Sequence, residues 1–91
     1  MAGEKKLRIV AFQDGESWIA QCVEYDIAVQ APDLTTLQRR MDALIQAEIE
    51  YTTTNNGGAF IGIDPAPDFY EAMFRGVDAT LQSDVDFRIA A

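Results

Sequence analysis

The sequence of 91 residues contains no histidine and only one cysteine, Cys22. Without histidine the chain lacks the side chain that most often serves as a general base or metal ligand near neutral pH. Cys22 cannot form an intrachain disulfide, and its place in an apolar run is typical of a small buried side chain. No serine lies in a Gly-x-Ser-x-Gly motif. We therefore predict a protein that is not an enzyme and that has no cofactor and no metal.

Basic residues are also scarce, with seven Lys and Arg against fifteen Asp and Glu and a formal net charge of −8. The electrostatic field of so negatively charged a protein repels phosphate backbones, so we expect no direct binding of nucleic acid. Residues 9–38 contain no base and five acids: Asp14, Glu16, Glu24, Asp26 and Asp33. This stretch favours a basic protein partner, contacted by an acidic rim made of Asp14, Glu16, Glu24 and Asp26. A solvated face that keeps a small protein dissolved is the alternative interpretation.

Long hydrophobic runs are missing as well. No apolar stretch approaches the roughly 18–20 residues that span a bilayer, and the N-terminal residues lack the apolar core of a signal peptide. Together with the lone cysteine, this pattern predicts a cytoplasmic protein without membrane contact. With 48% of its 91 residues apolar, the chain is expected to form a single domain. Because so small a domain buries little surface, we also expect a homodimer or higher homo-oligomer.

The first third of the chain has the composition of three short strands, at residues 7–12, 17–23 and 27–30. Asp14 and Gly15 supply a tight turn between the first two strands, because glycine adopts positive φ without steric cost. Residues 24–26 form the next connection. The pattern predicts an antiparallel meander. In the second strand both faces are apolar, so one face needs cover from a second element or a second subunit.

Two amphipathic helices are predicted after the meander. Asp33 is placed to cap the first, whose apolar stripe runs from Leu34 to Ile45, and residues 52–58 end it in a flexible connection. Residues 59–63 read as a short strand. The second helix begins near Asp68 and carries a wide apolar stripe: Phe69, Tyr70, Met73, Phe74, Val77 and Leu81. A final strand alternates Val85, Phe87 and Ile89 with Asp84, Asp86 and Arg88.

These elements define an α+β fold. We predict a small antiparallel sheet of three to four strands packed against one long helix, as a β-β-β-α core over about residues 6–52. A short amphipathic helix and a C-terminal strand follow over about residues 59–91. The aromatic face of the second helix is expected either to pack on the sheet or to form an oligomer interface. The candidate interface residues are Trp18, Phe69, Met73 and Phe74.

A carboxylate-based metal site is the remaining enzymatic alternative. Asp14 and Glu16 flank one turn, Glu24 and Asp26 flank the next, and carboxylate oxygens are the ligands that hard divalent cations prefer. Successive turns of a meander lie at opposite ends of the sheet, however, so the two pairs are expected to be separated by the length of a strand. This geometry makes a metal-dependent hydrolase the least favoured interpretation.

The order of strand, Asp-Gly turn, strand, short strand and long helix over about residues 7–50 resembles the HicB-like antitoxin family. The resemblance is carried by Asp14-Gly15, Trp18, Glu24-Tyr25-Asp26, Gln30 and the helix residues Leu34, Leu44 and Glu48. It implies a degenerate, catalytically silent relative of the RNase H fold that forms a dimer and covers a small, basic, RNA-targeting toxin.

The chain also departs from that family. Tyr25-Asp26 and Ala31-Pro32 stand where members often carry a Pro-Gly pair and a glycine. The region after Pro67 resembles neither of the DNA-binding segments with which members often end, so only protein binding is carried over. A stand-alone oligomeric scaffold or small-ligand-binding domain of the same fold remains the alternative.

Overall fold

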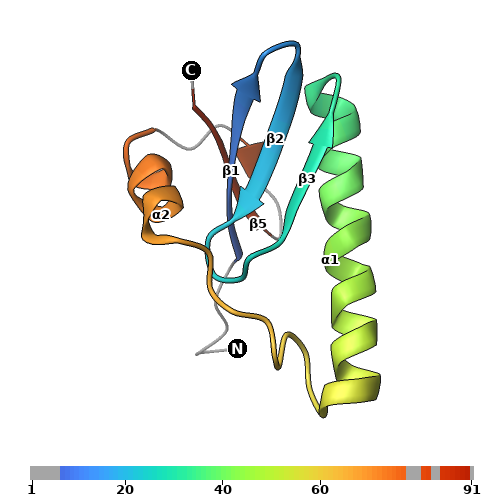
Figure 1. Ribbon diagram of the computed structural model, residues 1–91. Coiled ribbons are helices and arrows are strands. Elements are labelled where there is room, and N and C mark those ends of the chain that lie inside the picture. The colour runs from blue at the N-terminus through green and yellow to red at the C-terminus, as the bar shows by residue number, and fades with distance from the viewer. Residues whose placement is uncertain (1–6, 78–80, 83–84, 91) are drawn as a thin grey trace.

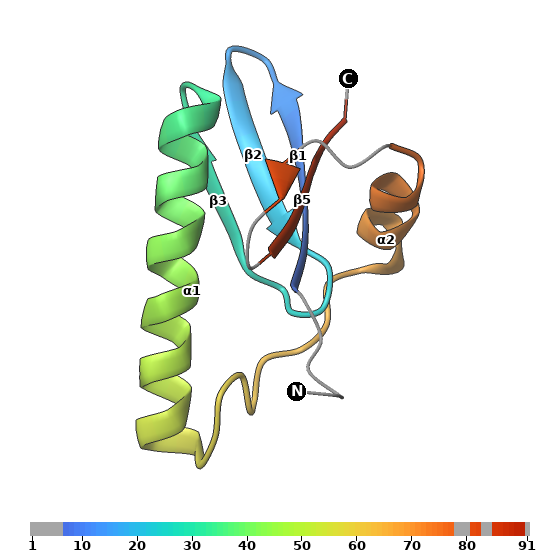
Figure 2. The same cartoon turned by 180° about the vertical axis from the view of Figure 1, so that it is seen from behind.

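The computed structural model describes residues 7–77, 81–82 and 85–90. Its elements, in chain order, are β1 (Leu7–Asp14), β2 (Ser17–Cys22), β3 (Ala28–Ala31), α1 (Leu34–Asn56), α2 (Asp68–Arg75), β4 (Leu81–Gln82) and β5 (Val85–Ile89). The strands form one sheet in the order β3-β2-β1-β5-β4, with α1 and α2 on opposite faces (Figures 1 and 2). The predicted α+β fold, with its long helix, short second helix and C-terminal strand, is confirmed.

The sheet is mixed, with five strands, and not antiparallel throughout. β1–β2, β2–β3 and β4–β5 pair antiparallel, as a meander and a hairpin require, whereas β5 pairs with β1 in parallel. A parallel pair needs a long crossover between its strands. The chain between β1 and β5 contains three strands and both helices, so it is long enough for that crossover, which the local strand pattern alone does not reveal.

The long helix α1 begins and ends at capping residues. The Thr36 backbone N–H donates a 2.7 Å hydrogen bond to the Asp33 carboxylate, and Gly57 ends the helix with a φ of 92°. The helix continues through residues 52–56, where the sequence predicts its end. Thr52 turns inward and is buried, with its hydroxyl donating to the Glu48 carbonyl at 2.6 Å. Packing therefore overrides the weak helix propensity of these residues.

The predicted strand at residues 59–63 is wrong, because this segment is a series of turns. Phe60 and Gly62 have φ values of 66° and 94°, a left-handed conformation that breaks strand geometry. The ring of Phe60 stacks on that of Tyr25, with centroids 4.3 Å apart. This contact packs residues 59–63 against the β2–β3 connection, in which Tyr25 lies.

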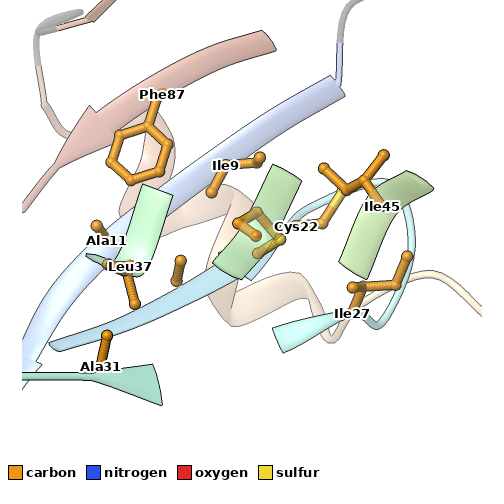
Figure 3. Close-up of a cluster of buried hydrophobic side chains, with 10 residues drawn as sticks. Ile9, Ala11, Cys22, Ile27, Ala31, Leu37, Ile45 and Phe87 are labelled. Carbon is orange, nitrogen blue, oxygen red and sulfur yellow. The ribbon is translucent and has the colours of Figure 1, made fainter. Parts of the chain in front are cut away.

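The main core lies between the sheet and α1 (Figure 3). Alternation along the strands directs one set of side chains to this face, and α1 covers them mainly over β2 and β3. Phe87 is buried beside Ile9, as the alternating pattern of the last strand predicts. The predictions for Asp84 and for the side chains of Leu81 and Val85 lie outside the described part of the chain. The buried cluster consists of Ile9, Ala11, Ala20, Cys22, Ile27, Ala31, Leu37, Met41, Ile45 and Phe87.

A smaller core holds α2 against the other face of the sheet. Phe74 is 3% exposed and packs on Val10 and Val23. The Arg88 guanidinium lies 4.1 Å from the Phe74 ring centroid, and its Nη1 donates to the Val77 carbonyl at 2.9 Å. These contacts fix the C-terminal end of α2, which stops at Arg75, earlier than the predicted stripe to Leu81.

Candidate protein-binding face

Only part of the sheet face beneath α2 is covered. α2 packs over β1, and within the described residues no helix lies over β2 and β3 on this side. Ile19, Ala28, Val29 and Gln30 there line an open hollow of about 260 Å³. The register pairs Ile19 with Gln30 and Gln21 with Ala28, so the side chains of these two pairs lie on one face of the sheet. The Val29 side chain points to the opposite face and packs against the α1 core. The hollow therefore offers an apolar floor at the edge of the sheet.

Aromatic side chains continue this surface from β1 onto α2. The Phe12 and Tyr70 rings stack with centroids 6.2 Å apart, and Phe69 meets Tyr70 edge-on at 5.2 Å. Phe12 is the cross-strand partner of Ile19, so the aromatic group adjoins the hollow. Phe69 remains 63% exposed, which is unusual for so large an apolar side chain. We define the open face as Phe12, Ile19, Ala28, Gln30, Phe69 and Tyr70.

Acidic side chains stand at both ends of the open face. Asp14 and Glu16 are exposed at the β1–β2 turn, and alternation places Asp14 on the same face as Phe12. Asp26 is exposed at the opposite end of β2, where its Oδ1 accepts a 3.1 Å hydrogen bond from Gln21 Nε2. The predicted separation of the two turns is confirmed by the strand register. The acids therefore bracket the open face and do not form one continuous rim.

Glu24, the fourth predicted member of the acidic rim, is engaged within the subunit. Its Oε1 accepts a 2.8 Å hydrogen bond from the Arg8 backbone N–H, and its Oε2 forms an ion pair with the Arg8 guanidinium. Hydrogen bonding to Glu24 raises the pKa of Arg8. Glu71 lies 3.5 Å from Arg8 Nη1 and also pairs with Arg75. Glu24 thus ties β1 to the β2–β3 connection and presents little uncompensated charge to a partner.

The four residues predicted for an oligomer interface are not brought together. Phe74 is buried in its own subunit, which corrects its assignment to an interface. Trp18 is half-buried against the α1 core on the opposite face of the sheet, and Met73 is half-buried beside Phe74. Only Phe69 lies on the surface. The sequence shows apolar faces correctly, but it cannot show which of them α2 covers.

The described residues hold no group of three Asp, Glu, Cys or His side chains placed to bind a metal ion. Cys22 is fully buried, and its burial raises the pKa of the thiol, which opposes formation of the reactive thiolate. Within residues 7–77, 81–82 and 85–90, no helix is both long and apolar enough to cross a bilayer.

Sequence reasoning identified an apolar second face at Ile19, but it did not show that this face stays open beside Ala28. Both belong to predicted strands, and alternation in the second strand already separates Ile19 from Trp18. The sequence does not show how much of the face α2 covers, and a helix of eight residues is too short to span it.

Comparison of the chain with protein-family models, with characterised proteins and with solved structures found no match.

Proposed function

We propose that this chain is a non-catalytic, HicB-like protein-binding module that binds a small basic protein through its open face. The observation that carries this proposal is the apolar floor and aromatic wall bracketed by Asp14, Glu16 and Asp26. Apolar contacts supply the affinity of such a surface for its partner. Acids at the margin of the surface attract a basic partner and set its orientation.

Two further features support this function. The formal net charge of −8 favours encounter with a basic protein and disfavours nucleic acid. The meander is followed by a long helix, and this order of elements is the one on which the resemblance to the HicB-like family rests. That resemblance implies a small RNA-targeting toxin as the partner. Under this proposal the module acts by covering the toxin, and no catalytic group of its own is needed.

A pull-down from the native cell's lysate at low and high salt, followed by mass identification, tests the proposal. We expect a stoichiometric small basic protein whose capture weakens at high salt, because exposed charge pairs are screened. The captured protein is then purified, titrated against the wild-type chain by calorimetry, and assayed for RNA cleavage with and without that chain. Capture of no basic protein, or an unchanged rate of RNA cleavage, would reject the antitoxin-type function.

Variants of the open face separate specific binding from general charge attraction. Ile19→Asp is expected to abolish binding, and the combination Asp14→Asn, Glu16→Gln and Asp26→Asn is expected to slow association. Asp42→Asn is the matched control, because Asp42 is exposed on α1, away from the open face. Hen lysozyme, a basic protein with no related role, serves as the probe for non-specific attraction. Equal loss of binding in the control variant, or equal binding of lysozyme, would contradict the assignment of this face.

A further inference from the structure

The asparagines of the chain, Asn55 and Asn56, are adjacent, and only Asn56 is followed by a glycine. The backbone nitrogen of the residue after an asparagine can attack the side-chain amide carbon and close a five-membered imide ring. A following glycine favours this attack, because it has no Cβ and adopts many backbone conformations. Asn56 is exposed at the C-terminal end of α1, so water has access to such a ring.

Hydrogen bonds hold both of the groups that take part in this reaction. The Gly57 N–H donates to the Thr52 carbonyl as the cap of α1, and Asn56 Nδ2 donates to the Ile61 carbonyl at 2.8 Å. A Cβ added at Gly62 would lie 3.0 Å from Asn56 Nδ2, so the amide fits closely against this glycine. We call the two hydrogen bonds the latch. Ring closure requires that the latch opens.

The segment that the latch holds also supports one end of the sheet. The Thr52 hydroxyl accepts a 2.7 Å hydrogen bond from the Phe60 N–H, and the Phe60 ring stacks on Tyr25. Farther along the segment, the Asp64 carbonyl accepts a 2.7 Å hydrogen bond from the Asp26 N–H. Opening of the latch therefore loosens the β2–β3 connection, which carries Tyr25 and Asp26.

We propose that Asn56 is a deamidation site that the closed latch protects and whose reaction permanently weakens the latch. In the open segment the Gly57 nitrogen bonds to Asn56 Cγ, and the bond from Cγ to the amide nitrogen breaks. The amide nitrogen leaves as ammonia with the proton from Gly57. Water then adds to one of the two imide carbonyls, and the ring opens to aspartate or isoaspartate. The only co-reactant is water.

Neither product restores the latch. A carboxylate at residue 56 has no N–H to donate, and it places acceptor oxygens against the Ile61 carbonyl. It also adds negative charge at the C-terminal end of α1, where the helix dipole disfavours an anion. Isoaspartate in addition lengthens the backbone by one methylene group directly before Gly57. The reaction therefore runs in one direction, and the inference rests on the isolated chain, independently of the proposed basic partner.

Peptide mapping by mass spectrometry, during incubation of the full chain at mildly alkaline pH, tests the site. We expect deamidation at Asn56 and none at Asn55, which no glycine follows. Unfolding in guanidinium chloride should raise the rate by roughly tenfold or more, since the folded chain reacts only through rare opening. Equal rates in the folded and unfolded chain would overturn the protection, and an unreactive Asn56 in guanidinium chloride would overturn the site.

Thr52→Val tests whether the segment after α1 controls the reaction. It removes the hydroxyl that holds Phe60, so it should raise the rate in buffer by roughly tenfold. In guanidinium chloride the variant and the wild type should react alike, because no latch remains. Thr52→Ser retains the hydroxyl and is the matched control. An unchanged rate for the valine variant in buffer would contradict the proposal.

Asn56→Asp reproduces one product and tests its effect on the latch. The backbone amides of Phe60 and Asp26 should exchange hydrogen roughly tenfold faster than in the wild type. Asn55→Asp is the matched control, because it adds the same charge one residue earlier, where the amide donates to the Tyr51 carbonyl within α1. Exchange that is unchanged in Asn56→Asp, or equally faster in Asn55→Asp, would overturn the weakening of the latch.

Discussion

The backbone N–H of Phe60 donates a 2.7 Å hydrogen bond to the hydroxyl of Thr52, one of two polar side chains that are buried among the residues the structure describes. Thr52→Val keeps the shape of the side chain but leaves the Phe60 N–H without its acceptor. We expect a loss of about 1–3 kcal/mol in the free energy of unfolding, measured with urea. Thr52→Ser retains the hydroxyl and should cost less, about 1 kcal/mol for the lost methyl group. A smaller loss for valine than for serine would contradict this role of the hydroxyl.

Phe69 and Phe74 lie on the same short helix, but their substitution by alanine should change the stability of the protein by very different amounts. Phe74 is 3% exposed between Arg8 and Arg88, whereas Phe69 is 63% exposed. Phe74→Ala is expected to cost about 3–5 kcal/mol of stability. Phe69→Ala should remain within about 0.5 kcal/mol of the wild type. Chemical denaturation of both variants decides the matter, and similar losses would mean that α2 is oriented differently.

Much of the fold could be predicted from local patterns in the sequence. Gly15 and its acidic neighbours indicate the first turn, Asp33 indicates the start of α1, and alternation correctly places Phe87 inside. These features depend on neighbouring residues alone. The parallel pairing of β1 with β5 depends on where the chain returns 70 residues after the end of β1, and no local pattern encodes it. Thr52 misled the prediction because its polarity suits a loop, although its hydroxyl is satisfied inside the fold.

The candidate site was less predictable than the fold. The sequence identifies the acids near the turns, and meander geometry correctly separates Asp14 from Asp26. It does not reveal that Glu24 pairs with Arg8, because the two residues are distant in the chain and meet only across the sheet. Charge reversal at Glu24 would therefore disturb the fold as well as any partner, so Asp26 is the cleaner position for testing partner contact.

Cys22 should be protected from thiol reagents in the folded protein. It is fully buried, and burial raises the pKa of its thiol, so both access and thiolate formation are suppressed. We expect its reaction with a disulfide reagent such as DTNB to be slower than in urea by on the order of a thousandfold or more, since only rare opening exposes it. Comparable rates in the two conditions would show that the α1 side of the sheet is open to solvent.

The cap at Asp33 predicts a specific dependence of stability on pH. The Thr36 N–H holds the pKa of the Asp33 carboxyl below its ordinary value of 3.8, so the folded state favours the ionised form. The stabilisation from ionisation is therefore fully present above that ordinary value and is lost as the pH falls through the lowered pKa. Asp33→Asn keeps a capping oxygen without the charge, and it should lower the melting temperature less than Asp33→Ala at neutral pH.

The decisive comparison is between the wild type and Asp33→Asn on acidification. Other carboxylates titrate in both proteins, so their contribution cancels in the difference between the two melting temperatures. We expect that difference to shrink as the pH falls below about 3.8, because protonation removes the charge that only the wild type carries. A difference that stays constant through this range would mean that the Asp33 carboxylate does not stabilise α1 through its charge.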